Sequence, residues 1–496
     1  DDAGIARRTP TRTSHTQVEA CGRCHSRRSV SRDPYHYGEP LLDTHRVSLL
    51  EPGLYHPDGQ ILEEVYVYGS FLQSRMHREG VTCSDCHDAH SLELVREGDA
   101  LCASCHLPAK YEAEEHHHHK AGTEGSACVD CHMRFEYYMV VDPRHDHSMR
   151  VPRPDLSAEL GTPDACSDCH ADKGLEWTVE AFGEWYPERL GKPHYGQAID
   201  AGRRATTEAP RLLAELIADR EQPGIVRATA IGLFADYMTV GSLDLLQSVA
   251  GDPDPFVRLG AARLLAFLNP EARSLVSPGL LGDAVLSVRV AAAQALLAVP
   301  GDQLAPEERA ILEPVVEELR RTHEVNLDRA ESHLVLGALH AQLGEMGEAR
   351  ARYERAIALD PTSVAAQINL ADLDRSIGNE RGAGERLRQA LDVDPESADA
   401  HHAMGLWLVR QSRLAEAVPS LRRAAELAPE TSRYAYVQAV AMWSAGDRAG
   451  ALAVLDASQA RRPADRSTLL ALVGYHLEGG ERAAAEHYGR LLIDLY

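Results

Sequence analysis

The ten cysteines of this chain fall in five pairs, and a histidine directly follows each pair. The five stretches are Cys21-Gly22-Arg23-Cys24-His25, Cys83-Ser84-Asp85-Cys86-His87, Cys102-Ala103-Ser104-Cys105-His106, Cys128-Val129-Asp130-Cys131-His132 and Cys166-Ser167-Asp168-Cys169-His170, here called motifs 1 to 5. C-x-x-C-H is the attachment signature of c-type haem: the two thiols add to the vinyl groups of one porphyrin, and the histidine ligates the iron. The sequence therefore predicts five covalently bound haem c groups, with His25, His87, His106, His132 and His170 as proximal iron ligands.

Two other kinds of site use paired cysteines. A C-x-x-C pair can be a redox dithiol or half of a zinc site. Ten cysteines could also form five disulfides in a secreted domain. Neither alternative requires a histidine directly after the second cysteine of every pair, so haem attachment is the preferred interpretation.

The sequence contains enough histidines to supply a second axial ligand, opposite the proximal histidine, to every iron. Eighteen of the 25 histidines lie at or before His194, and 13 of these are not in a motif. We therefore expect five bis-histidine, low-potential haems; methionine, the other soft axial ligand, is scarce and scattered here. The favoured distal candidates are His45, His56, His90, His117 or His119, and His147. Which candidate serves which haem stays open.

The totals limit the partners and the location. The formal net charge is −24, which argues against nucleic acid and anionic membrane surfaces. No run of 18 apolar residues occurs, so no membrane span is expected. The chain begins at Asp1 without Met or an apolar segment, which suggests a removed leader. Because haem is attached to this motif outside the cytoplasm, we expect an exported protein, periplasmic or extracellular.

Residues 1–200 are rich in turn signals and poor in periodic apolar sequence. We expect a loop-rich pentahaem cytochrome c domain in which the porphyrins supply much of the core, as metals and disulfides do in small folds. Short helices are expected near residues 61–79 and 173–190, without substantial sheet.

Residues 205–300 repeat with a period of 31. Val226-Arg227, Val257-Arg258 and Val288-Arg289 share one phase, and Asp252 and Asp283 share another. An aspartate, a turn and an alanine- and leucine-rich helix resemble HEAT-type repeats, and we expect the two aspartates to cap helices. Residues 301–329 read as a helical connector.

From residue 330 to 496 the period is 34. Pro361, Pro395, Pro429 and Pro463 keep this spacing, as do Gly344, Gly378, Gly446 and Gly480, with Ser412 at the missing step. This is the tetratricopeptide pattern of paired helices, and it predicts about five units. The expected fold class is mainly α: a loop-rich haem domain followed by an α-solenoid.

Several stretches resemble a known family. Pro40-Leu41-Leu42-Asp43-Thr44-His45, Gly69-Ser70-Phe71-Leu72-Gln73-Ser74, Gly80-Val81-Thr82 before motif 2 and Tyr138-Met139-Val140-Val141-Asp142-Pro143 look like exported multihaem cytochromes c with helical-repeat tails. Their haem spacing is similar to that of the hydroxylamine oxidoreductase and cytochrome c nitrite reductase superfamily. The resemblance implies that His45, His56, His90, His117 or His119, and His147 are its recurrent histidines. The C-x-x-C-K motif of nitrite reductases is absent.

Two functions follow as competing hypotheses. The first is a multihaem electron-transfer protein whose repeats dock redox partner proteins or copies of itself, in one version as subunits of an extracellular conductive cytochrome filament. The second is an exported oxidoreductase that acts on a small nitrogen or sulfur compound at one open haem. Because spare histidines are abundant and C-x-x-C-K is absent, electron transfer is favoured over catalysis and no catalytic residue is assigned.

Overall fold

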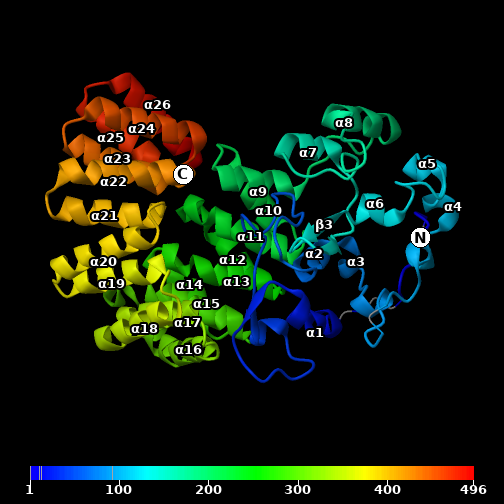
Figure 1. Cartoon of the computed structure of the whole chain (residues 1–496), viewed down its shortest axis with the longest axis horizontal. Coiled ribbons are helices and arrows are strands. Elements are labelled where there is room, and N and C mark those ends of the chain that lie inside the picture. Colours follow the sequence, from blue (N-terminus) through cyan, green and yellow to red (C-terminus); the bar gives the residue numbers. More distant parts are fainter. Residues whose placement is uncertain (1, 10–11, 13, 92) are drawn as a thin grey trace.

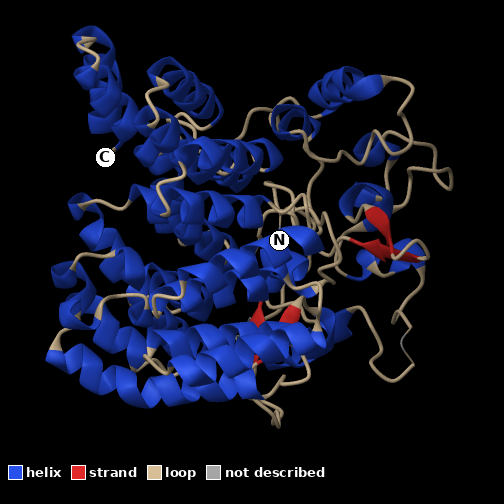
Figure 2. Cartoon of the chain, turned by 60° about the vertical axis from the view of Figure 1, so that its left-hand side comes forward, coloured by secondary structure: helices blue, strands red, loops and turns tan. Residues whose placement is uncertain are grey.

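The computed structural model describes residues 2–9, 12, 14–91 and 93–496, and it is mainly helical (Figures 1 and 2). Figure 1 shows a loop-rich N-terminal region on one side and stacked helices on the other. The expected mainly α fold class, with an α-solenoid after a loop-rich region, is confirmed.

The N-terminal region contains short elements. Its helices are α1 (Thr16–His25), α2 (Tyr68–Gln73), α3 (Arg75–Arg78), α4 (Pro108–Tyr111), α5 (Glu114–His117), α6 (Cys128–His132), α7 (Pro154–Leu160) and α8 (Gly174–Trp185), with 3-10 turns η1 (Leu41–Asp43), η2 (Cys83–Asp85), η3 (Gly98–Ala100) and η4 (Cys102–Ser104). Strands β1 (Arg28–Val30) and β2 (His45–Val47) form one antiparallel pair, and β3 (Phe135–Tyr138) and β4 (Asp142–His145) form another. Sheet is therefore minor in the described residues.

The N-terminal region has few buried apolar side chains where most motifs lie. Leu41 to Leu72 contribute to the main core, but among the described residues between Leu72 and Leu156 only Tyr138 is a buried hydrophobic residue. A segment of this length does not hold one conformation without an apolar core, a metal or a covalent link. Motifs 2 to 4 all lie in this segment.

A layer of helix pairs follows. It consists of α9 (Tyr195–Arg204), α10 (Ala209–Ala218), α11 (Gly224–Phe234), α12 (Leu243–Ala250), α13 (Pro255–Arg263), α14 (Pro270–Leu281), α15 (Leu286–Leu297) and α16 (Pro306–Glu324), with η5 (Ala235–Tyr237), η6 (Val240–Ser242), η7 (Leu264–Phe267) and η8 (Gly301–Gln303). Helix α9 packs on α10 and α11, so this layer begins at Tyr195. The 31-residue period appears as α11, α13 and α15 packed in sequence.

The repeated arginines and acids of this layer form a ladder of ion pairs. The pairs are Arg227–Asp252 (2.9 Å), Arg258–Asp283 (2.6 Å) and Arg289–Glu318 (2.8 Å). The expectation that Asp252 caps a helix is wrong. The cap of α13 is Asp254, two residues later, which accepts the Phe256 N–H. Asp252 instead accepts the Asp254 N–H and faces the arginine of the preceding repeat.

The last part of the chain is an array of five helix pairs. They are α17 (Ala330–Gln342) with α18 (Met346–Leu359), α19 (Val364–Ser376) with α20 (Glu380–Val393), α21 (Ala398–Arg410) with α22 (Leu414–Leu427), α23 (Ser432–Ser444) with α24 (Arg448–Arg461), and α25 (Arg466–Glu478) with α26 (Arg482–Leu495). Gly344, Gly378, Gly446 and Gly480 have φ between 78° and 91°, the left-handed region that glycine enters without strain. Ser412 adopts φ 59° at the equivalent turn. The helix pairs follow the 34-residue period of the sequence.

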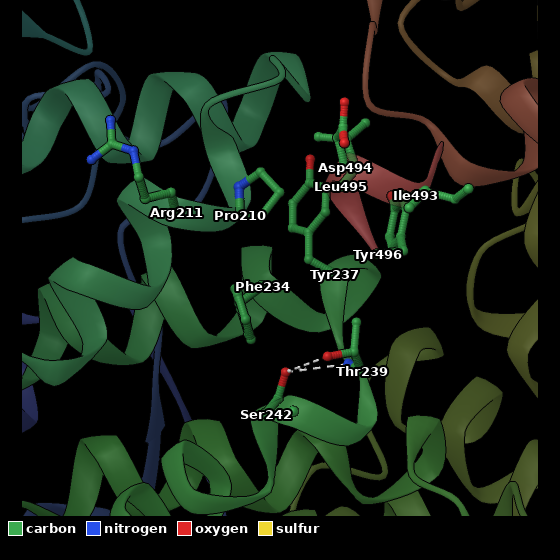
Figure 3. Close-up of a pocket in the computed structure, with 11 residues that line it drawn as sticks. Pro210, Arg211, Phe234, Tyr237, Thr239, Ser242, Ile493, Asp494, Leu495 and Tyr496 are labelled. Atoms are coloured by element: carbon green, nitrogen blue, oxygen red, sulfur yellow. Dashed lines mark hydrogen bonds between the residues drawn. The ribbon is translucent and has the colours of Figure 1, made fainter. Parts of the chain in front are cut away.

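The array returns to the helical layer at its far end. Tyr496 stacks on Tyr237 with ring centres 6.0 Å apart, and the Ala464 N–H donates to the Ala205 carbonyl (2.8 Å). A small open cavity of about 370 Å³ lies beside this contact and is shown in Figure 3. Because both ends of the array are attached to the layer, its curvature is fixed by more than its own repeats.

Hydrogen bonds join the N-terminal region to the layer near motif 1. The Leu286 N–H donates to Asp43 Oδ1 (2.6 Å), and Arg203 donates to the carbonyls of Tyr55 (2.9 Å) and Leu50 (2.8 Å). Asn326 Nδ2, just before the first repeat, donates to the Val30 carbonyl (2.8 Å). The layer therefore fixes the position of β1 and β2. In the described part of the chain, no helix is both long and apolar enough to cross a membrane.

The ion-pair ladder gives a stability prediction. Asp252→Ala leaves the Arg227 guanidinium buried without its carboxylate, since the two side chains are 5% and 1% exposed. Breaking a buried pair in this way costs about 3–5 kcal/mol. We expect the urea midpoint of the helical CD signal to fall markedly. Glu385→Ala, which removes an exposed pair with Arg381, is the control and should change the unfolding free energy by less than about 1 kcal/mol. Equal midpoints for the two variants would contradict the prediction.

Candidate functional site

Each motif is built on one helical turn. Motifs 1 and 4 lie on α1 and α6, and motifs 2 and 3 start with the 3-10 turns η2 and η4. In motifs 2, 3 and 5 the histidine N–H donates to the carbonyl of the first cysteine (2.9 Å). Residues separated by three and four positions share one face of a helical turn, so both thiols and the following histidine can face one ligand. None of the ten cysteines is in a disulfide.

Three motif histidines each face a histidine from another segment. The ring centres of His87 and His147 are 6.2 Å apart, those of His132 and His116 are 6.1 Å apart, and those of His170 and His119 are 6.1 Å apart. All three pairs are near parallel, with interplanar angles of 22°, 10° and 28°.

This spacing fits one metal ion between two imidazoles. A metal–imidazole nitrogen bond is about 2 Å long, and the ring centre lies about 1 Å behind the nitrogen, so two axial imidazoles have centres about 6 Å apart. Direct stacking would bring the rings closer, as between His118 and Trp185 (4.0 Å). The three pairs therefore fit the axial ligands of a haem iron.

Hydrogen bonds leave the correct nitrogen free in one member of each pair. Nδ1 of His147 meets the His145 carbonyl (2.8 Å), Nδ1 of His132 meets the Arg150 carbonyl (2.8 Å) and Nδ1 of His119 meets the His117 carbonyl (2.6 Å). A carbonyl only accepts, so Nδ1 carries the proton and Nε2 stays available to a metal. Burial lowers the pKa of His87, His116 and His147, which favours the neutral imidazole that ligates.

The run His116–His119 serves two motifs because the backbone turns within it. Helix α5 ends at His117, and His118 has a left-handed φ of 57°. His116 therefore faces His132 and His119 faces His170. His119 was a predicted distal ligand; His116 was not favoured over His117. His117 does not face a motif histidine, and its Nδ1 accepts the His119 N–H (3.1 Å).

The other predicted distal ligands lie apart from the motif histidines. His45 is buried against the Thr44 hydroxyl (2.8 Å), and burial, with Arg28 and Arg23, lowers its pKa to about 4. His56 is half-buried, and burial lowers its pKa. His90 is exposed, on a turn that Asp88 holds.

Two motif histidines have no imidazole opposite them within the described chain. The ring of His106 meets Tyr111 edge-on, with centres 5.4 Å apart, and the ring of His25 contacts no other ring. His15 and His77 contact each other, with ring centres 4.8 Å apart, rather than a motif histidine.

The motifs are neighbours in chain order. The Cys83 thiol lowers the pKa of Cys21, and the Cys128 thiol lowers the pKa of Cys102, so motif 1 lies beside motif 2 and motif 3 beside motif 4. After burial, Cys102 and Cys105 contribute to raising the pKa of Cys86, and Cys131 contributes to raising the pKa of Cys166. Successive motifs are therefore neighbours, and the five motifs together are called the row.

A zinc interpretation has no site in the described residues, where no three or more His, Cys, Asp or Glu side chains gather in a way that could hold a metal ion. Structural zinc needs four such ligands. A haem iron needs only two axial ligands from the protein, because the porphyrin supplies the others. The paired imidazoles and free thiols fit that requirement.

Comparison with known proteins shows that the C-terminal helices are similar to tetratricopeptide repeats. Tetratricopeptide repeat models match residues 340–406, and residues 313–364 and 402–466. A TPR repeat-containing protein of Pseudomonas aeruginosa is 31% identical over 188 residues, which cover 36% of this chain and 68% of that protein. Among solved structures, the MamA protein has 19% identity and a TM-score of 0.29 over 34% of this chain and 91% of its own. Pseudomonas aeruginosa pilF has 20% identity and a TM-score of 0.31 over 38% and 86%.

The histidine run gives a ligand prediction. His116→Ala and His119→Ala each remove the imidazole opposite one motif histidine, so each should convert one iron from low spin to high spin in the ferric electron paramagnetic resonance spectrum. His117→Ala is the matched control and should add no high-spin signal to the spectrum of the parent protein. A high-spin signal from the His117 variant, with none from the other two, would show that the assignment of the run is wrong.

Proposed function

We propose that this chain, which belongs to the tetratricopeptide repeat proteins, is an exported multihaem cytochrome c. In this proposal it transfers electrons through its haems and binds protein partners through its repeats. The observation that carries the proposal is the set of three near-parallel histidine pairs, each joining a motif histidine to a histidine from another segment at 6.1–6.2 Å.

The packing of the N-terminal region supports the same proposal. Between Leu72 and Leu156, Tyr138 is the single buried hydrophobic residue among those described, although three motifs lie there. Five porphyrins would supply the apolar surface that the side chains lack. Without them, the loops around motifs 2 to 4 have little to pack against.

The residues of the row suit electron transfer. A haem attached at each motif supplies reversible one-electron chemistry between ferric and ferrous iron. The cysteines fix each group covalently, and the histidines at motifs 2, 4 and 5 close both faces of the site. Closed sites exclude substrates, and contact between successive motifs provides a path through the region.

The repeats supply the surface for the partner. Helical solenoids offer extended concave faces to peptides and proteins. The partner is a redox protein or a second copy of this chain; in the polymer version, copies assemble into a conductive extracellular filament. Electron micrographs of the purified protein distinguish these versions, because filaments support the second and discrete particles contradict it.

The direct test is the haem content of the exported chain. We expect its intact mass to exceed the polypeptide mass by five haems, and the ferric spectrum to change reversibly to the ferrous one with dithionite and air. Cys169→Ser, which removes one thioether, should weaken attachment at motif 5 alone. A purified exported chain whose mass equals that of the polypeptide would overturn the proposal.

A second candidate function rests on the surroundings of His106. Its ring meets Tyr111 and no second imidazole, so a haem there could keep one iron face for a small nitrogen or sulfur compound. Cyanide separates the two functions. Formation of a cyanide complex at one iron in five supports an oxidoreductase, whereas an unchanged spectrum supports electron transfer alone.

A further inference from the structure

Motif 1 differs in charge from the other four motifs. The residue before the second cysteine is Arg23 in motif 1, but Asp85, Ser104, Asp130 and Asp168 in motifs 2 to 5. Residues 20–32 contain four arginines and no acidic residue. Residues 164–176 contain three aspartates, one glutamate and one lysine. The two ends of the row therefore carry opposite local charge.

Arg32 pairs with Glu39 (3.2 Å), whereas the other three of these arginines have no carboxylate partner among the described residues. Arg23 stacks on Tyr35 with its guanidinium 4.1 Å from the ring centre, and its buried Nε has no hydrogen-bond partner. Arg27 donates to the Glu64 carbonyl (3.4 Å), and Arg28 donates to the Arg23 carbonyl. Both acceptors are backbone groups, so three guanidinium charges remain around this site.

Acidic and basic groups are balanced differently at the other sites. At motif 2, Asp85 pairs with Arg8 (2.7 Å) and Arg12 (3.3 Å), so its negative charge is compensated. At the far end of the row, Asp168 pairs with Arg134 (2.6 Å), but Asp164 has no cationic partner.

Asp164 is a buried negative charge between motifs 4 and 5. One carboxylate oxygen accepts from the Ser167 N–H (3.0 Å) and hydroxyl (2.8 Å), and the other is buried without a partner. The residue is 7% exposed. It contributes to raising the pKa of both Cys166 and Cys131, although burial is the larger cause, and this contribution places it close to both motifs.

We propose that Arg23, Arg27 and Arg28 give the haem attached by Cys21 and Cys24 the highest reduction potential of the five, and that Asp164 holds the potentials at motifs 4 and 5 down. Electrons then move along the row toward motif 1. The inference rests on the proposed electron-transfer function and adds its direction.

The physical reason is the charge that reduction adds. Ferric iron gains one electron and no proton, so nearby cations stabilise the reduced state and nearby anions destabilise it. Because every porphyrin brings the same two carboxylates of its own, the arginines distinguish motif 1 from the other four motifs. In the net transfer, a ferrous iron at motif 5 is oxidised to ferric and a ferric iron at motif 1 is reduced to ferrous, which balances the single electron.

This direction brings electrons toward the helical layer. Strand β1 begins at Arg28, and its Val30 carbonyl accepts from Asn326 at the start of the repeats. Arg46 on the neighbouring strand β2 is exposed. The proposed high-potential end of the row therefore lies beside the strand that contacts the start of the repeats.

The test is a potentiometric titration of the intact exported protein with all five haems, followed by visible absorbance. In the double variant Arg23→Gln/Arg28→Gln, we expect the highest of the five midpoint potentials to fall by about 59 mV. This shift is a tenfold change in the equilibrium constant of a one-electron reduction. The four lower steps should stay in place. Asp164→Asn should raise one of the low steps. Arg381→Gln, on an arginine that is 92% exposed in the repeat array, is the control and should shift none.

Arg28→Gln alone covers the case in which replacing Arg23 inside the motif prevents attachment, and it should shift the same step in the same direction. An unchanged highest step, or a fall confined to a lower step, would overturn the inference. These outcomes are distinct from failure of the proposed function, which would appear as an unmodified chain with no haem or no reversible reduction.

Discussion

The segment that carries motifs 2 to 4 lacks an apolar core of its own. Between Leu72 and Leu156, the described residues bury one hydrophobic side chain, Tyr138. A chain of this kind loses about 1–2 kcal/mol of backbone entropy for each residue that it orders, and burial of apolar surface normally offsets this loss. Here the porphyrins proposed at motifs 2 to 4 would supply apolar surface of this kind. The folding of this segment therefore depends on its proposed cofactors.

The helical layer is stabilised by a large apolar core and by repeated ion pairs. Its buried residues form one large cluster that reaches from Val18 to Leu495, and its repeated arginines pair with acids one repeat further on. Because this cluster includes Leu41 to Leu72, motif 1 is held on a rigid support while motifs 2 to 5 extend away from it. The other end of the row is held as well, because Gln60 Nε2 donates to the Pro163 carbonyl (2.8 Å) and Gln197 Nε2 donates to Glu159 (3.0 Å).

Periodic and local features could be predicted from the sequence, and features set by backbone direction could not. The 34-residue period gave the five helix pairs because glycine, proline and small residues mark each turn locally. His116 was missed because the left-handed turn at His118, which decides where each ring of the run points, has no marker in four identical letters. The spacing of Asp252 predicts a helix cap, but the arginine that Asp252 pairs with is 25 residues away in the sequence. The return of Tyr496 to Tyr237 is a contact between distant segments that no local pattern encodes.

The net charge of the protein could be predicted from the sequence, but the positions of its buried charges could not. The net charge of −24 describes the whole surface, where charges more than about 10 Å apart are screened by salt. A charge inside the protein acts through a lower effective dielectric, so one buried group outweighs several exposed ones. Asp164, which is 7% exposed and has an orphaned oxygen, is such a group, and at the other end of the row the half-buried Arg23 has an orphaned Nε. Composition alone would assign the protein a uniform acidic character, whereas the positions of these two residues make the row electrically polar.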